Sequence, residues 1–211
     1  MSISLNLVDS NRKIRADIER AILQELTKDL DKKAKKIQKQ LRSIMPSWVG
    51  ASPEINSLLA AGQPESLGAQ LGLTPAAAAA AVDNIIAAVS ESVKVEVSEK
   101  VRKIKDLTVT VSIQPSDFQN LLTLETSAYL TERGSKIDWL SWLLFSGTKT
   151  IITGFSYEAD SSFGRSGGGF MSFGGVWRIP PQFAGTENDN FITRIFNNKQ
   201  KDVQRLLEGL F

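Results

Sequence analysis

Apolar residues recur at steps of three or four along residues 11–45, with charged residues between them. The series consists of Ile14, Ile18, Ile22, Leu26, Leu30, Ile37, Leu41 and Ile44. This spacing predicts one long amphipathic helix, capped by Asp9 or Ser10 and ended by Pro46. At about 1.5 Å per residue, the helix would be about 50 Å long, more than a small domain is wide. It therefore either lies across its own domain, or projects and packs on another chain.

Two further helix starts follow, each a hydroxyl residue in front of a proline: Ser52 before Pro53, and Thr74 before Pro75. Proline suits the first helical position behind such a cap. The second of these helices opens with six consecutive alanines, which favour helix but bury little area each. It is either a thin helix in close contact with another helix or a poorly anchored one. Because glycines interrupt the segments before it, we expect residues 50–91 to project or to be mobile.

Beyond the helices, apolar and polar residues alternate at period two in residues 93–97 and 107–113. This pattern, rich in valine and threonine, predicts two half-buried antiparallel strands. Two strands alone are marginal, and residues 150–157, 169–173 and 176–179 could supply further strands.

Two capping-box spacings predict the remaining helices. Residues 135–138 precede a short apolar run that ends at Gly147, and residues 186–189 precede a helical pattern with a break at residues 197–198. In the shorter run we expect three aromatic side chains to anchor the core: Trp139, Trp142 and Phe145.

Helices followed by strands predict an α+β protein. Residues 1–91 would form a long N-terminal helix and a helical segment. Residues 92–211 would form an antiparallel β-sheet or sandwich with short helices. Together they would make one structural unit.

The chain contains neither histidine nor cysteine. Their absence excludes an imidazole base, a thiolate nucleophile, and histidine or cysteine metal ligands. Ser146 and Lys149 have the Ser-x-x-Lys spacing, but this serine would end a helix, whereas the catalytic motif needs it at a helix start. We therefore predict that the protein is not an enzyme and binds no cofactor.

Neither a signal-peptide pattern nor an apolar run of about 18 residues is found, so we expect no membrane partner.

Residues 32–42 carry six basic residues and no acidic one. These candidate DNA-facing residues are Lys32, Lys33, Lys35, Lys36, Lys39 and Arg42. Such a run is either a solvated helix face or a surface for nucleic-acid phosphates, and both interpretations stay open. The long helix carries no aromatic residue, which argues against stacking on bases.

Residues 164–175 include six glycines, without the spacing of a phosphate-binding loop. Apolar side chains lie among them, and as candidate contacts between subunits we select Phe163, Phe170, Met171 and Phe173. The segment is either an ordinary hairpin loop or a flexible one that becomes ordered when these side chains pack on a neighbouring chain.

Several short strings occur in the last third of the chain. They are Asp-Trp-Leu-Ser-Trp-Leu-Leu at 138–144, Gly-Arg-Ser-Gly at 164–167, Trp-Arg-Ile-Pro at 177–180, Phe-Ala-Gly-Thr at 183–186 and Asn-Phe-Ile-Thr-Arg at 190–194. In these strings the chain resembles the neck proteins of contractile-tailed bacteriophages. The resemblance implies a structural virion protein that joins the portal-bearing head to the tail through ring assembly. It implies no catalytic residue.

The same resemblance implies the partners and the location. The partners would be further copies in a homo-oligomeric ring, adjacent portal, connector or tail-terminator proteins, and packaged DNA in the channel. The protein would occupy the neck of the virion, and the host cytoplasm during assembly. Two alternatives stay open: a tail-completion or terminator protein that caps the tail tube, and a nucleic-acid-binding accessory protein.

Overall fold

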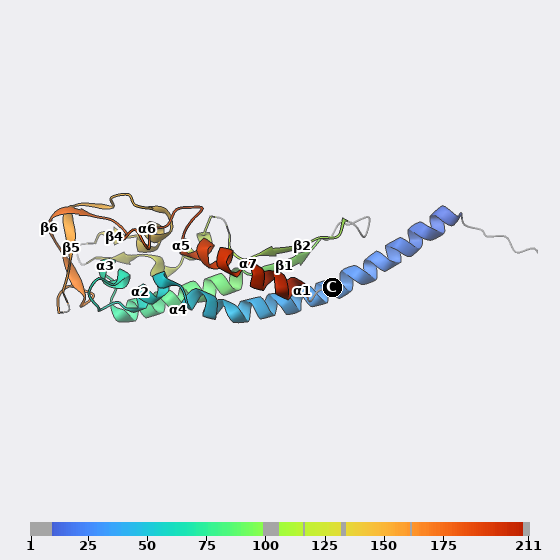
Figure 1. Ribbon diagram of the computed structural model, residues 1–211, viewed down its shortest axis with the longest axis horizontal. Coiled ribbons are helices and arrows are strands. Elements are labelled where there is room, and N and C mark those ends of the chain that lie inside the picture. The colour runs from blue at the N-terminus through green and yellow to red at the C-terminus, as the bar shows by residue number, and fades with distance from the viewer. Residues whose placement is uncertain (1–9, 99–105, 116, 132–133, 161, 209–211) are drawn as a thin grey trace, which may run out of the picture.

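The computed structural model describes residues 10–98, 106–115, 117–131, 134–160 and 162–208. The chain is elongated, and its first helix runs along most of the length (Figure 1). Shorter helices and small antiparallel sheets pack on the C-terminal part of this helix, while its N-terminal part projects beyond them. The predicted α+β class is confirmed.

Helix α1, Asn11–Gly50, continues past the predicted end. Its start is as predicted, because the Ser10 hydroxyl accepts a hydrogen bond from the backbone of the first turn. Pro46 lies inside the helix on its exposed side, where it removes only one backbone hydrogen bond. Met45 and Val49, on either side of it, are fully buried. Packing of the last turn against the core therefore outweighs the lost hydrogen bond.

Three helices follow α1: α2, Pro53–Leu59; α3, Leu67–Gln70; and α4, Pro75–Ser92. Both predicted caps are confirmed. The Ser52 and Thr74 hydroxyls each accept a hydrogen bond at 3.2 Å from the backbone N–H three residues later.

The alanine-rich helix α4 packs on α1 and α2 (Figure 1). Its buried residues form one face: Ala78, Ala81, Val82, Ile85 and Val89. Of the two alternatives for this helix, close contact with other helices is therefore the one observed. The expectation that the helix is poorly anchored is corrected. The small side chains of α4 allow its backbone to approach the neighbouring helices closely. Contact along its whole buried face therefore offsets the small area that each alanine buries. The mobility of residues 50–91 and the division at residue 91 stay predictions.

Strands β1, Lys94–Val97, and β2, Val109–Ser112, pair antiparallel as predicted. No third strand among the described residues joins them. Val95 and Val97 are instead buried against α1, so a helix covers the sheet face that we expected other strands to cover. The tip of this hairpin, residues 99–105, lies outside the described residues.

The other predicted strands form one sheet of their own, and two short strands that the sequence patterns did not predict form another. Strands β5, Ile152–Ala159, and β6, Gly169–Trp177, pair antiparallel, and so do the short strands β3, Tyr129–Leu130, and β4, Lys136–Ile137. The single sheet or sandwich that we expected is thus three separate two-stranded sheets in the described part of the chain.

Helix α6, Trp139–Phe145, lies at the predicted place, after α5, Gln119–Leu122, and a short 3₁₀ turn, Glu125–Ser127. Trp139 is fully buried, and its indole N–H donates to the Thr126 carbonyl at 2.8 Å.

The other expectations for α6 hold in part. Trp142 and Phe145 are only half-buried. The predicted capping box is wrong, because Ser135 belongs to the turn before β4 and Asp138 makes no capping hydrogen bond.

Helix α7, Phe191–Glu208, runs beside α1 and has no break at residues 197–198 (Figure 1). Asparagine is only mildly unfavourable inside a helix, and both asparagines here are exposed. The cap is Asn190, whose side-chain oxygen accepts from the N–H groups of Ile192 and Thr193 at 3.1 Å. The predicted cap at Thr186 instead closes the preceding turn.

Candidate assembly surfaces

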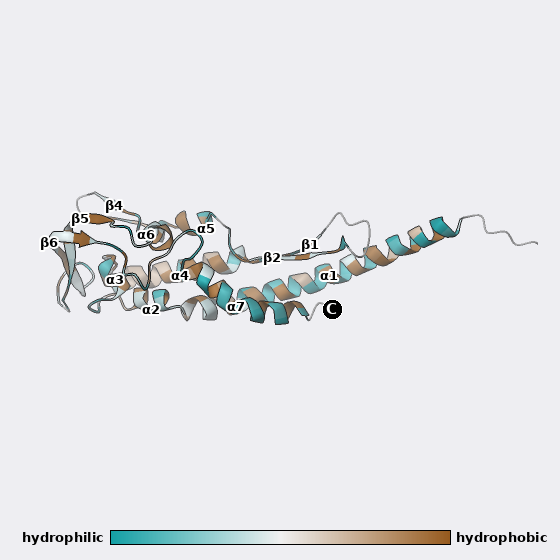
Figure 2. Cartoon of the chain, turned by 45° about the horizontal axis from the view of Figure 1, so that its top comes forward, coloured by the Kyte–Doolittle hydropathy of each residue, from teal (hydrophilic) through white to brown (hydrophobic). Residues whose placement is uncertain are grey.

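The first candidate surface is the lysine face of α1, which we define as Lys32, Lys35, Lys36 and Lys39. All four side chains are exposed, and none forms an ion pair with a described residue. Their spacing of three or four places them on one side of the helix. The buried residues of the same stretch lie on the other side and are Leu30, Ala34, Ile37 and Leu41. Figure 2 shows the resulting mixture of hydrophilic and hydrophobic residues along α1.

The two remaining candidate DNA-facing residues have structural partners. Lys33 forms an ion pair with Asp29 at 3.1 Å. Arg42 donates to the carbonyl oxygens of Glu91 at 2.9 Å and Val93 at 3.1 Å. These carbonyls end α4, so the Arg42 guanidinium satisfies groups that the helix leaves unpaired. Arg42 therefore joins α1 to α4, and its contact with DNA stays a prediction.

The second candidate surface is the ribbon made by β5 and β6, at the end of the molecule opposite to the projecting part of α1 (Figure 1). The glycine-rich segment is only partly a loop, because β6 begins at Gly169. Tyr157 pairs with Met171 across the ribbon, and both side chains pack against the core.

The tip of the ribbon docks on its own chain. Ser166 and Gly168 are buried, and a Cβ atom at Gly168 would lie 2.6 Å from the Gln63 carbonyl oxygen. The Tyr157 hydroxyl donates to the Gly168 carbonyl at 2.8 Å. Residues 164–168 therefore form an ordinary hairpin loop that packs on its own chain. They are not a segment that makes contacts only with a neighbouring chain.

The four candidate contact residues differ in exposure. Phe163 is 61% exposed and its ring lies 6.1 Å from that of Phe170, which is 38% exposed. Met171 is half-buried, whereas Phe173 is 90% exposed. Their contact with a neighbouring subunit stays a prediction.

A bulge beside Phe173 interrupts the regular pairing of β5 and β6. The pairing passes from Thr153 opposite Val176 to Phe155 opposite Phe173, so one glycine on β5 faces two on β6. These glycines, Gly154, Gly174 and Gly175, have φ angles of +82°, +104° and +79°. A Cβ atom at Gly154 or Gly174 would meet nothing within 4 Å, so glycine is needed there for its backbone conformation and not for space.

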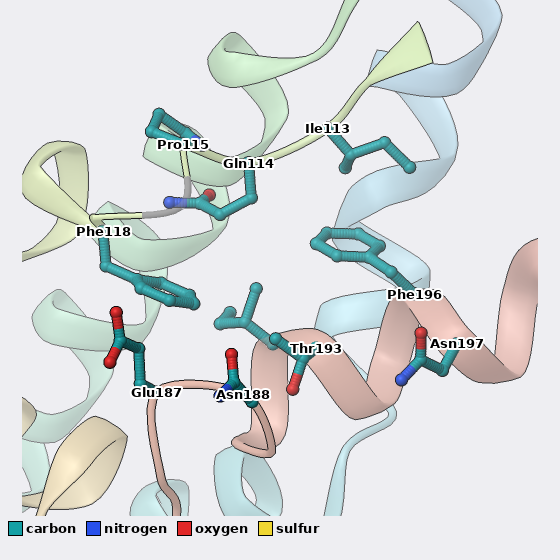
Figure 3. Close-up of a pocket in the computed structure, with 10 residues that line it drawn as sticks. Ile113, Gln114, Pro115, Phe118, Glu187, Asn188, Thr193, Phe196 and Asn197 are labelled. Carbon is teal, nitrogen blue, oxygen red and sulfur yellow. The ribbon is translucent and has the colours of Figure 1, made fainter.

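A pocket of about 390 Å³ lies between the segment after β2 and the start of α7 (Figure 3). Its apolar walls are Ile113, Pro115, Phe118, Ile192 and Phe196. The polar residues that line it are Gln114, Glu187, Asn188, Thr193 and Asn197. Sequence patterns gave no sign of this pocket, because its walls come from separate segments of which each is an ordinary strand or helix end.

The projecting part of α1 is the remaining apolar surface. Ile18 is 54% exposed and Ile22 51% exposed, at a spacing of four on one helix face. The elongated molecule therefore exposes large apolar side chains at both ends.

No cluster of carboxylates in the described ranges could hold a metal ion, and no helix there is long and apolar enough to cross a membrane. Ser146 directly follows the last residue of α6, so it lies at the end of a helix, as predicted. Burial raises the pKa of the Tyr129 and Tyr157 hydroxyls, and both donate to backbone carbonyls.

No protein-family model, curated protein or solved structure matches this chain. Its function is therefore inferred from the residues and surfaces described above.

Proposed function

We propose that this protein is a structural component of the phage neck, which joins the portal-bearing head to the tail as a homo-oligomeric ring. The location in the neck is supported by the sequence resemblance, and the ring by the surfaces of the chain. No chemical step is part of the proposal: the protein acts by packing on its neighbours.

The observation that carries ring assembly is the exposed area of the single chain. A compact monomer of 23.1 kDa would expose about 9,700 Å², whereas this chain exposes 13370 Å². A stable interface takes about 800 Å² from each partner, so two neighbours in a ring would cover about 1,600 Å² per subunit. The excess of about 3,700 Å² is larger than this area, and it includes the projecting half of α1 and the residues outside the described ranges.

The positions of the exposed apolar residues also favour a ring. The isoleucines of α1 and the phenylalanines of the ribbon lie at opposite ends of the molecule and on different elements. A chain with two different contact surfaces associates head to tail, and such an assembly closes into a ring when the rotation per subunit permits it.

Mass photometry and negative-stain imaging of the purified chain test the assembly. We expect a single closed species at a fixed multiple of the monomer mass. A monomer at every concentration would contradict self-assembly of the isolated chain.

Immunogold labelling of purified phage particles tests the location. We expect label at the head–tail junction of whole particles. Label on free tails as well would favour the terminator alternative, and particles without label would contradict a virion role.

The lysine face supports a second candidate function, contact with nucleic acid. Its four ammonium groups are exposed without acidic partners among the described residues, which is the arrangement that binds phosphates non-specifically. In a ring this face could line the channel that DNA passes through, and in the accessory-protein alternative it would bind DNA directly.

A further inference from the structure

We propose that Phe173 of one copy inserts into the pocket between the end of β2 and the start of α7 in the next copy. The inference rests on the ring assembly proposed above and names the contact that builds it. Its carrying observation is that one chain contains both an aromatic side chain displayed to solvent and an apolar pocket elsewhere.

The displayed side chain is held in place by the backbone. The bulge at Gly154, Gly174 and Gly175 adds an extra residue to β6 directly after Phe173. Bulges of this kind redirect a side chain, here away from the core. The Phe155 ring, 4.9 Å from the Phe173 ring, supports it from one side. Nothing in the described part of the chain covers the Phe173 side chain itself, since 90% of it is exposed.

The pocket suits an aromatic side chain better than a polar ligand. Five of its ten lining residues are apolar, and Glu187 is its one charged residue. Among the described residues, no buried side-chain polar atom lacks a hydrogen-bond partner, so no such group in the pocket requires a polar ligand. Figure 3 shows the Phe118 and Phe196 rings on either side of the space, where an inserted ring would meet both.

The pocket and Phe173 are far apart in one molecule. The ribbon lies at one end, whereas the start of α7 lies near the middle of the molecule, beside α5 (Figure 1). The contact therefore joins two copies, and it joins different surfaces of the two. It is heterologous and leaves one free Phe173 and one free pocket on every dimer, so further copies can add, and the assembly closes into a ring when the rotation per subunit permits it.

The charges around the two surfaces are complementary. Lys149 and Arg178 flank the base of the ribbon, where the Ile151 N–H donates to the Trp177 carbonyl. Glu187 lines the pocket, and Asp117 adjoins the lining residue Phe118. Both cations and both carboxylates are exposed, and none of the four forms an ion pair with a described residue. Insertion of Phe173 brings the basic base of the ribbon toward the acidic edge of the pocket.

The chain lacks cysteine, so single cysteines can report this contact. We would prepare Val176→Cys and Asn197→Cys, which places one thiol on the ribbon, three residues after Phe173, and one in the pocket, while Phe173 itself is kept. Both positions are exposed, so the fold should tolerate the changes. Asn198→Cys is the matched control, because it is exposed on the same helix but does not line the pocket.

Mild oxidation or a short bis-maleimide, followed by non-reducing electrophoresis, provides the readout. We expect a dimer from the mixture of Val176→Cys and Asn197→Cys, and none from either variant alone. The double variant should give a ladder of multimers. The mixture with Asn198→Cys should give at least tenfold less dimer.

Three outcomes would overturn the proposal: dimers from Val176→Cys alone, equal yields with Asn197→Cys and Asn198→Cys, or no cross-link in the first mixture. Rings that form without this cross-link would contradict the contact but not the proposed neck function, because another interface would then build the ring. The cross-link in a protein that is absent from virions would retain the contact and reject the neck.

Discussion

At the scale of single residues, Arg194 holds three parts of the chain together. Its Nη1 lies 2.9 Å from Oε1 of Glu54, its Nε lies 2.9 Å from Oδ1 of Asp189, and its Nη2 donates to the Ala184 carbonyl at 2.6 Å. Only 5% of the Glu54 side chain is exposed, so α2 brings a buried carboxylate to α7. Arg194 is the only described residue that forms an ion pair with it.

We expect Arg194→Gln to lower the free energy of unfolding by about 3 kcal/mol, because it leaves the Glu54 carboxylate buried without a partner. Arg205→Gln is the control. Arg205 pairs with Asp202 in solvent, at 3.6 Å, and an exposed pair of this kind contributes about 0–1 kcal/mol. Urea unfolding followed by circular dichroism measures both variants. Equal midpoints for the two would contradict the role of Arg194.

The chain contains two tyrosines, Tyr129 and Tyr157. Burial raises the pKa of both above the ordinary value of 10.0, and the Arg165 guanidinium, 4.3 Å from the Tyr129 ring centroid, partly opposes this shift for Tyr129. A raised pKa means that the folded state holds these protons more tightly than the unfolded state. The resulting stabilisation is present below pH 10 and is lost as the pH rises through the raised values.

Ultraviolet absorbance of tyrosinate gives the measurement. We expect a midpoint above 10.0 in the folded chain and near 10.0 in urea. Arg165→Gln should raise the pKa of Tyr129 further, as read in the Tyr157→Phe background, because a cation that favours the tyrosinate is removed. A lower midpoint in that variant would show that Arg165 acts differently.

At the scale of elements, sequence patterns located most helices and strands but not what covers them. Period-two alternation located β1 and β2, yet the partner of their buried face is α1, which sequence spacing does not reveal. Pro46 failed as a helix end because the burial of Met45 and Val49 depends on contacts distant in the sequence. The lysine face could be predicted, since it follows from helix geometry alone. The role of Arg42 could not, because its acceptors lie about fifty residues away.

The alanine-rich helix α4 allows a direct test of close packing. Ala81 belongs to the buried face of α4, and Ala80 beside it is exposed. Ala81→Leu should lower the free energy of unfolding by about 1–3 kcal/mol, because the added carbons have no space. Ala80→Leu adds the same atoms in solvent and should change it by less than about 0.5 kcal/mol. If both variants unfold at the same urea concentration, α4 is not closely packed at this position.

At the scale of the whole molecule, charge and apolar surface are separated. The lysine face lies in the middle of α1, while the exposed phenylalanines and isoleucines lie toward the two ends of the molecule. The surfaces proposed above for contact between copies, the ribbon with Phe173 and the pocket at the start of α7, include no residue of the lysine face. In a ring each copy would present the same lysine face. The number of phosphate contacts that one DNA duplex can make would then rise with the number of copies.

The salt dependence of DNA binding tests this arrangement. Each phosphate neutralised on duplex DNA contributes about 0.9 to the slope of log affinity against log salt. Changing Lys32, Lys36 and Lys39 to glutamine should therefore reduce the slope by up to about 2.7 per bound subunit. The matched control removes the same charge at Lys94, Lys136 and Lys201, which are exposed elsewhere. Fluorescence anisotropy with a random-sequence duplex measures both, for the isolated chain and for assembled rings. We expect the wild-type slope in the control and a shallower one in the lysine-face variant. Equal slopes in the two would mean that net charge alone attracts the DNA and that the lysine face has no special part in binding.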